Sequence, residues 1–262
     1  MTGPIVLVHG NPETDAVWDL LLGALDRLDV FRLSPPGFGS PLPSGFDSSM
    51  DRYRDWLIAR LEAFAQPVHL VGHDWGGLHA LNVAMTRPDL LRSWVSDAAG
   101  VYDSDYRWHP LAQIWQAPGA GEEWVNAAFA APLPQRIIAM RELLGADTAA
   151  ASPTVARVAR IAERVAAGQD ADMARAVLSL YRSAAQPVMA QAGRGLHSAA
   201  ARPGLIVDAT DDDTTGNMES RARMAEVAGA SIARLHGLGH WWMVQDPHRA
   251  AQVLNNFWAS QK

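Results

Sequence analysis

The sequence predicts an α/β fold in which a mostly parallel, doubly wound sheet carries an all-α insertion. Short apolar runs bounded by turn residues alternate with longer helical patterns, as expected for strands that crossover helices cover on both faces. The alternation stops over residues 101–201, where helical patterns continue without a convincing strand. With 262 residues and 48% hydrophobic composition, the chain is long enough for one large domain with an inserted subdomain.

The expected elements follow the order β, α, β, α, β, α, β before the insertion, and the sheet resumes after it. The strands are predicted at the short apolar runs Ile5–Val8, Val30–Leu33, Val68–Val71, Trp94–Ser96, Leu205–Val207 and Ser231–Leu235. The helices are predicted over Ala16–Leu28, Ser49–Ala65, Gly77–Thr86 and, at the end of the chain, Pro247–Trp258. Residues 1–100 and 202–262 are therefore assigned to a core domain, and residues 101–201 to a helical cap domain.

The composition excludes several classes of function. The formal charge of −6 is spread along the chain without a block of Lys or Arg, so no nucleic-acid partner is expected. The absence of cysteine excludes disulfides, thiol catalysis and Cys-ligated metals, and it is compatible with the cytoplasm. The apolar run Ile5–Val8 is too short for a signal peptide, and no other stretch approaches a membrane span. We expect a cytoplasmic monomer or homodimer that contacts no membrane.

A glycine-rich turn at residues 72–77, GHDWGG, follows a predicted strand and opens the next helix. This strand–turn–helix context is that of a nucleophile elbow, in which one strained residue projects its side chain above the carboxyl edge of the sheet. The flanking glycines let strand and helix approach closely. Because Asp74 is at the tip, we expect its carboxylate to be the nucleophile; the alternative is an ordinary helix N-cap.

A base and an acid follow along the chain in the order that this type of site requires. His240 lies in a loop after the last predicted strand, where its imidazole can reach Asp74 as a general base. An acid that orients this imidazole is expected at the end of another strand. Asp212 is the favoured candidate and Asp97 is the competing one.

An aspartate nucleophile limits the reaction to displacement at saturated carbon, because its attack on an ester or amide would form a less stable anhydride. The product is an alkyl ester of Asp74, which water activated by His240 hydrolyses without a cofactor or metal. The leaving group is then a halide, held by indole or amide N–H groups, or an epoxide oxygen, protonated by a phenol. Trp75 and Asn11 are of the indole and amide types. Asn11 follows the first strand, where the fold supplies an oxyanion-type donor, although Asn-Pro is also common in plain turns.

The chain resembles the aspartate-nucleophile branch of the α/β-hydrolase superfamily, which includes haloalkane dehalogenases, haloacetate dehalogenases and epoxide hydrolases. The resemblance rests on residues 9–12 (HGNP), the GHDWGG turn, residues 36–40 (PGFGS) and residues 239–241 (GHW), and it spans nearly the whole chain. It implies the α/β-hydrolase fold, with the cap inserted after the strand that follows the nucleophile helix. It also implies that Asn11 and Trp75 hold a departing halide. One departure is that few residues precede the first strand, where family members usually carry an additional strand pair.

The cap residues resemble more than one subfamily. Tyr181 resembles the ring-opening tyrosine of epoxide hydrolases, with Tyr102 or Tyr106 as a possible second phenol. Trp108 and the same Tyr181 resemble the halide-binding pair of haloacetate dehalogenases. The arginines that those enzymes place just after the nucleophile are absent, so a carboxylate-bearing substrate is disfavoured.

The preferred hypothesis is that the protein is a hydrolase that cleaves a carbon–halogen bond of a neutral, apolar small molecule. Epoxide hydrolysis is the alternative. A further alternative is a non-catalytic binding protein of the same fold, against which the intact set of nucleophile, base and acid argues.

Overall fold

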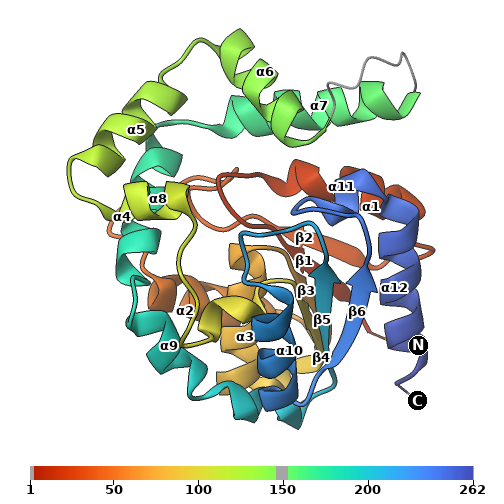
Figure 1. Ribbon diagram of the computed structural model, residues 1–262. Coiled ribbons are helices and arrows are strands. Elements are labelled where there is room, and N and C mark those ends of the chain that lie inside the picture. Colours follow the sequence, from red (N-terminus) through yellow and green to blue (C-terminus); the bar gives the residue numbers. More distant parts are fainter. Residues whose placement is uncertain (1–2, 146–152, 262) are drawn as a thin grey trace.

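A six-stranded, wholly parallel sheet forms the centre of the computed structural model, which describes residues 3–145 and 153–261 (Figure 1). Its strand order is β2-β1-β3-β4-β5-β6. The strands are β1 (Ile5–Val8), β2 (Val30–Leu33), β3 (Val68–Gly72), β4 (Leu91–Ser96), β5 (Gly204–Ala209) and β6 (Ser231–Leu235). All carboxyl ends therefore meet at one edge, where open α/β sheets bind their ligands.

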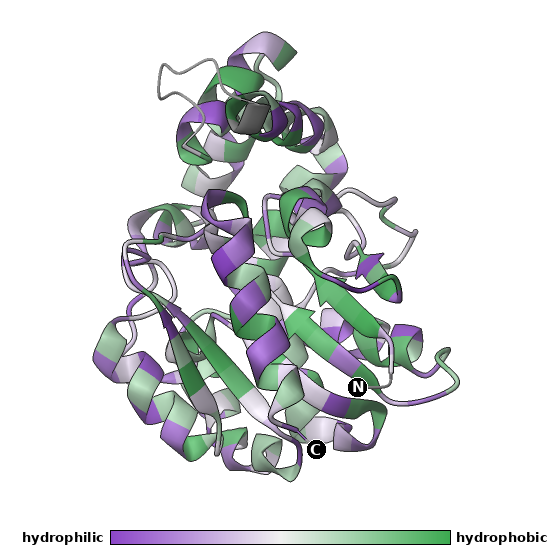
Figure 2. Ribbon diagram, turned by 90° about the vertical axis from the view of Figure 1, so that its right-hand side faces the viewer, coloured by the Kyte–Doolittle hydropathy of each residue, from purple (hydrophilic) through white to green (hydrophobic). Residues whose placement is uncertain are grey.

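Helices cover both faces of the sheet, which explains why the central strands have no exposed side chain. The core helices are α1 (Asp19–Ala24), α2 (Met50–Leu61), α3 (Trp75–Thr86), α10 (Met218–Val227), α11 (Trp242–Gln245) and α12 (Pro247–Ala259). One hydrophobic cluster joins α2, α3 and α10 to the sheet, and a second joins α1, α11 and α12 to the opposite face. Figure 2 shows the apolar strands enclosed between helices whose outer surfaces are more hydrophilic.

The region between β4 and β5 is helical throughout its described residues. It contains α4 (Pro110–Gln116), α5 (Ala120–Phe129), α6 (Leu133–Leu143), α7 (Pro153–Gly168), α8 (Ala171–Ser183) and α9 (Val188–Gly193). Short 3-10 helices lie at Asp15–Trp18, Pro88–Leu90, Ala99–Tyr102 and Leu196–Ala201. We use the word cap for α4 to α8, which lie over or beside the carboxyl edge of the sheet in Figure 1. None of the described helices is both long enough and apolar enough to cross a membrane.

The observed elements agree with the predicted ones except at several ends. The predicted helix Ala16–Leu28 is wrong in extent, because the chain forms a 3-10 turn at Asp15–Trp18 and α1 ends at Ala24. Gly23 weakens this helix, and Leu25 turns into extended backbone while it remains buried, which returns the chain toward β2. The predicted helix Ser49–Ala65 is also shorter, since Ser49 caps α2 with its side chain and α2 ends at Leu61.

Candidate active site

Asp74 occupies the tip of a tight turn between β3 and α3, in a backbone conformation that few residues adopt. Its φ is 51° and its ψ is −123°, so the turn is strained. A Cβ on Gly76 would overlap the backbone of β1, and a Cβ on Gly10 would overlap the Asp74 carboxylate. The two glycines therefore permit a close approach that sets the carboxylate above the carboxyl edge of the sheet.

Asp97 follows β4 and holds this turn from below. One carboxylate oxygen, Oδ1, accepts the backbone N–H of Asp74 at 2.8 Å. The other, Oδ2, contacts His73 Nδ1 at 2.5 Å and accepts the indole N–H of Trp242 at 2.7 Å. These hydrogen bonds join Asp97 to the elbow and the core, and none of those to the described residues reaches His240, so Asp97 is in a supporting position.

His240 and Asp212 come together from the ends of β6 and β5. His240 Nδ1 lies 3.0 Å from Asp212 Oδ2, while Thr214 donates to the other Asp212 oxygen through its backbone N–H at 2.8 Å. Burial opposes charge on both partners. The attraction between the two charges outweighs this effect of burial. The pKa of His240 is therefore raised, and that of Asp212 is lowered well below its usual range. The carboxylate can therefore fix the orientation and tautomer of the imidazole.

The two oxygens of the Asp74 carboxylate have different neighbours. Oδ1 accepts the backbone N–H of Asn11 at 3.0 Å, whereas Oδ2 lies 4.0 Å from His240 Nε2. Burial raises the pKa of Asp74 to about 6, although His240 and the Asn11 N–H favour the ionised form. Asp74 is thus a poorly hydrated carboxylate near neutrality, a state that favours nucleophilic attack in a closed cavity.

A buried charge network lies behind these residues and was missed by sequence reasoning. Glu13 is 2% exposed; its Oε1 lies 3.3 Å from His73 Nε2 and accepts the Trp241 indole N–H. Burial opposes both charges, yet the pKa of Glu13 falls to about 2 and that of His73 rises well above its ordinary value, since Glu13 and Asp97 flank His73. The sequence signal was an acidic residue directly after the HGNP segment.

One member of this network, His73, lies next to the base His240. The rings of His73 and His240 lie 4.6 Å apart between centroids, so the buried network packs directly against the imidazole. Glu13, His73 and His240 present ligand-type atoms within 4.8 Å of one another, a spacing compatible with a metal ion. The same three residues also form an ion-pair network that supports the base, through contacts with one another, with Trp241 and with Asp212.

A cavity of about 600 Å³ lies between the sheet edge and the cap, and we call it the elbow cavity. Its size is typical of pockets for small molecules. The core contributes polar groups, which include Asn11, Glu13, Asp74, Thr214 and His240. The cap contributes mainly apolar side chains, among them Leu111, Trp115, Trp124, Phe129 and Tyr181. A molecule in this cavity would contact the polar groups at one end and an apolar wall over most of its length.

The candidate leaving-group donors differ in their availability. Neither amide atom of Asn11 has a hydrogen-bond partner among the described residues, although Asn11 is buried and lines the elbow cavity. The indole N–H of Trp75 likewise makes no well-formed hydrogen bond within the described residues, while its ring packs edge-on against Tyr181 at 5.3 Å. A buried amide without a partner is costly, so the Asn11 side chain is suited to an incoming acceptor, whereas the Trp75 side chain interacts with that of Tyr181.

Trp108 was predicted as a further residue that binds the leaving group, and the structure places it behind Trp75. Its indole N–H donates to the Ala184 carbonyl at 3.3 Å, and its ring stacks behind Trp75 at 5.8 Å with an interplanar angle of 16°. The donor is therefore already used. Trp108 packs behind the site and supports the Trp75 ring.

The three cap phenols considered in the sequence lie in different positions. Tyr181 lines the elbow cavity; burial and the nearby Asp74 charge raise its pKa well above 10.0. Tyr106 is also buried, but its hydroxyl donates to the Thr214 carbonyl at 2.6 Å. The Tyr102 hydroxyl donates to Asn82 Oδ1 at 2.8 Å, away from the cavity. One phenol is thus available in the cavity wall, and a matching second one is engaged elsewhere.

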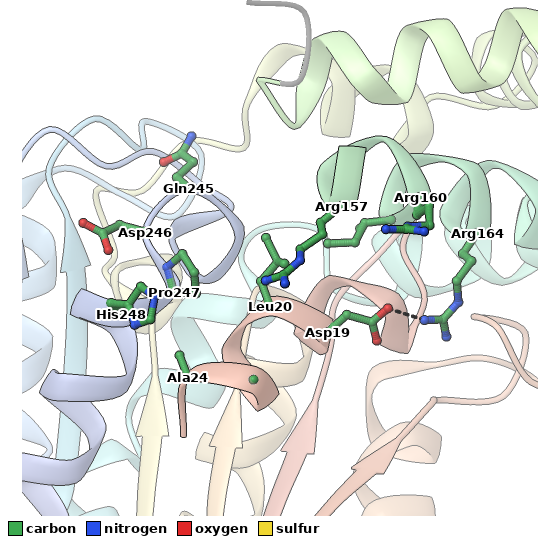
Figure 3. Close-up of a pocket in the computed structure, with 12 residues that line it drawn as sticks. Asp19, Leu20, Ala24, Arg157, Arg160, Arg164, Gln245, Asp246, Pro247 and His248 are labelled. Atoms are coloured by element: carbon green, nitrogen blue, oxygen red, sulfur yellow. Dashed lines mark hydrogen bonds and ion pairs between the residues drawn. The ribbon is translucent and has the colours of Figure 1, made fainter. Parts of the chain in front are cut away.

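A second hollow of about 660 Å³ lies outside this site, between α7, α1 and the start of α12 (Figure 3). Arg157, Arg160 and Arg164 of α7 line one side of it, and Asp19 pairs with Arg164 there. It contains none of the side chains that gather around Asp74. The elbow cavity, which contains Asp74 and His240, is therefore the candidate active site.

Comparisons with known proteins identify the family. A model described as the alpha/beta hydrolase family matches residues 5–253. An epoxide hydrolase of Caballeronia sordidicola is 34% identical over 98 residues, which are 35% of this chain and 30% of that protein. A haloalkane dehalogenase of Mycolicibacterium paratuberculosis is 31% identical over 119 residues, which are 44% of this chain and 40% of that protein. The matched segments thus span less than half of these relatives.

A solved structure extends the likeness to the complete fold. The crystal structure of E-2-(acetamidomethylene)succinate hydrolase has a TM-score of 0.70 and 18% identity, and the alignment covers 98% of this chain and 91% of that one. At this identity the likeness concerns the fold alone. The named reactions of the three proteins differ, so the comparisons establish a family, not a reaction. The family match extends over nearly the whole sheet and cap, and the chain therefore belongs to the alpha/beta hydrolase family.

Proposed function

We propose that the protein hydrolyses a carbon–halogen bond through a covalent alkyl ester on Asp74, with His240 as base and Asp212 as the acid that orients it. One observation carries the proposal: the Asp74 carboxylate lies beside Asn11, a buried residue of the cavity wall whose side-chain amide has no hydrogen-bond partner among the described residues. A halide leaves as an anion and needs N–H donors, but it needs no proton. The apolar wall of the elbow cavity suits an alkyl chain around the reacting carbon.

In the first step, Asp74 Oδ2 attacks the carbon from the side opposite the halogen. The new C–O bond forms as the C–halogen bond breaks, and the halide leaves with the bonding electron pair. Asn11 and Trp75 receive the departing anion. The Asn11 backbone N–H stays on Oδ1, which becomes the carbonyl oxygen of the ester.

In the second step, His240 Nε2 takes a proton from a water molecule, and the resulting hydroxide attacks Cγ of Asp74. The negative charge that develops on Oδ1 is stabilised by the Asn11 backbone N–H, which already points at this atom. Asp212 stabilises the imidazolium that forms. Collapse of the intermediate breaks the bond between Cγ and Oδ2 and releases the alcohol, which takes its proton from His240. The Asp74 carboxyl group then loses the remaining water proton to solvent, which regenerates the carboxylate.

The experiment is turnover of a panel of 1-bromoalkanes and of styrene oxide by the purified protein. We expect bromide release with the bromoalkanes, and loss of that release by about 10⁴-fold in Asp74→Asn, in which an amide replaces the nucleophile. Turnover of styrene oxide alone would replace the dehalogenase proposal with the epoxide one. Unchanged activity in Asp74→Asn would overturn the mechanism, and binding without any turnover would favour a non-catalytic protein.

Epoxide hydrolysis is the second candidate, and Tyr181 is the observation that favours it. A phenol in the cavity wall could protonate the alkoxide as the ring opens. We rank it second because Tyr106, the nearest counterpart, uses its hydroxyl on the Thr214 carbonyl. Asn11 also supports the halide, since its amide has no role in protonating an alkoxide.

A further inference from the structure

Arg136 lines the elbow cavity and belongs to α6. Figure 1 shows that α6 lies in the cap, away from the edge of the sheet. The half-buried guanidinium of Arg136 is held in place by backbone carbonyls. Nε donates to Ala131 at 3.1 Å, and Nη1 donates to Ala166 at 2.7 Å and also to Gln169. Nη2 makes no hydrogen bond to the described residues. The cation is therefore fixed in position, and the two N–H donors of Nη2 are unused.

The charge of Arg136 has no carboxylate partner among the residues that the structure describes, in contrast to other arginines of the cap. Arg141, on the same helix, lies 3.5 Å from Glu163, and Arg182 lies 2.7 Å from Glu122. Within residues 3–145 and 153–261, no carboxylate comes within 4.0 Å of the Arg136 guanidinium. Carbonyl groups orient a guanidinium but do not neutralise it, so its positive charge acts on whatever enters the cavity.

The opposite end of the elbow cavity carries the acidic groups Asp74, Glu13 and, behind His240, Asp212. The cavity is therefore acidic at the sheet edge and cationic at the cap, with an apolar wall between the two ends. We infer that the substrate carries a carboxylate at the end remote from the reacting carbon, and that Arg136 binds it. This inference rests on the proposed function, which supplies the reacting end.

The inference departs from the expectation of a neutral substrate. The absence of arginines after Asp74 disfavours a carboxylate on the reacting carbon itself, and that reasoning still applies. Arg136 comes from the cap, so it favours a carboxylate at the other end of the molecule. The repulsion by Asp74 would give such a substrate one orientation, with the carboxylate outward and the halogen-bearing carbon inward.

The binding test uses hexanoate and hexan-1-ol, whose binding is followed through the fluorescence of the cavity tryptophans Trp115 and Trp124. Arg136→Gln keeps an amide donor for the carbonyls of α7 but removes the charge. We expect it to weaken hexanoate binding about tenfold relative to hexan-1-ol, the size of one charge-assisted hydrogen bond. The matched control, Arg141→Gln, removes a charge from the same helix outside the cavity and should leave the ratio unchanged. Equal weakening of both ligands, or of neither, by Arg136→Gln would overturn the inference.

The turnover test separates this inference from the proposed function. We expect Arg136→Gln to lower the ratio of kcat/KM for 6-bromohexanoate to that for 1-bromohexane about tenfold, and Arg141→Gln to leave it unchanged. If the unmodified protein hydrolyses 1-bromohexane but the ratio does not respond to Arg136→Gln, the inference fails and the proposed function stands. If it hydrolyses neither bromide while hexanoate binding still depends on Arg136, the proposed function fails and the anion site stands.

Discussion

The core and the cap contribute to the elbow cavity in different ways. Each core group, from Asn11 to His240, comes shortly after a parallel strand, and the strand order alone brings these groups to one edge. The cap groups Tyr181 and Arg136 come from helices whose positions depend on side-chain packing against the core. Under the proposed function, the sheet edge therefore supplies the reacting groups, whereas the helices above it select the molecule that reacts.

The largest effect on a group at the sheet edge is expected for His240→Gln, which removes the base for the second step only. We expect turnover of 1-bromohexane to fall about 10³-fold while Asp74 is still alkylated. Mass spectrometry of the intact protein should then detect one added hexyl group, which peptide mapping assigns to Asp74. Recovery of unmodified protein with full loss of turnover would mean that His240 acts in the first step as well.

Asp97→Ala tests how much the hydrogen bonds to Asp97 stabilise the elbow. The substitution leaves the N–H of Asp74, His73 and Trp242 without their shared acceptor, so we expect a loss of about 3–5 kcal/mol in the free energy of unfolding. Urea denaturation measures this loss. Asp105→Ala is the control, because Asp105 is 84% exposed and its removal should cost less than about 0.5 kcal/mol. Similar stability in the two variants would show that the network is dispensable.

Asn11→Ala isolates the side-chain amide, because the backbone N–H that contacts Asp74 Oδ1 remains. We expect kcat/KM for bromoalkanes to fall about 10²-fold through poorer stabilisation of the departing halide. Bromide release under single-turnover conditions provides the measurement. A normal rate of release would exclude Asn11 as a halide donor and would weaken the distinction from an epoxide hydrolase.

The pH dependence tests the environment of Asp74 alone. The nucleophile is the ionised carboxylate, and burial raises its pKa from 3.8 to about 6. The rate of alkylation in a single turnover should therefore rise with pH, level off above about pH 6, and fall about tenfold per unit below it. A rate that stays constant down to pH 4 would contradict a desolvated nucleophile.

Tyr181→Phe should have the smallest effect if a halide leaves, since a halide needs no proton. We expect bromoalkane turnover to change by less than about fivefold, because the aromatic ring and its packing are kept. For an epoxide the same substitution removes the acid, and about 10²-fold is expected. A large loss with bromoalkanes would instead make the cap a participant in the reaction.

The sequence predicted the core better than the cap, for a physical reason. The strands β1, β2 and β6 have the predicted ends, because short apolar runs between turn residues are a local signal. The place of Asp74 at a strand–turn–helix junction also depends on nearby glycines. The use of the Trp108 indole on the Ala184 carbonyl depends on how two cap segments pack, which no local pattern contains.

Glu13 and Arg136 mark the limit of such prediction within the site. An isolated acid or base in a sequence carries no sign of its partner. The low pKa of Glu13 depends on His73, which is 60 positions away in the sequence. The proposed role of Arg136 depends on the fact that no carboxylate lies beside it in the described part of the chain. Whether a charged side chain has an oppositely charged neighbour depends on the complete fold, so only the structure shows it.

The unequal surroundings of the two Asp74 oxygens affect the origin of the product's oxygen atom. Oδ1 accepts the Asn11 N–H, so Oδ2 is the atom that would bond to the substrate in the proposed reaction. Under the proposed reaction that atom leaves inside the alcohol, and an atom from water takes its place in the side chain. The protein would thus give up one of its own oxygen atoms in every cycle and renew it from solvent.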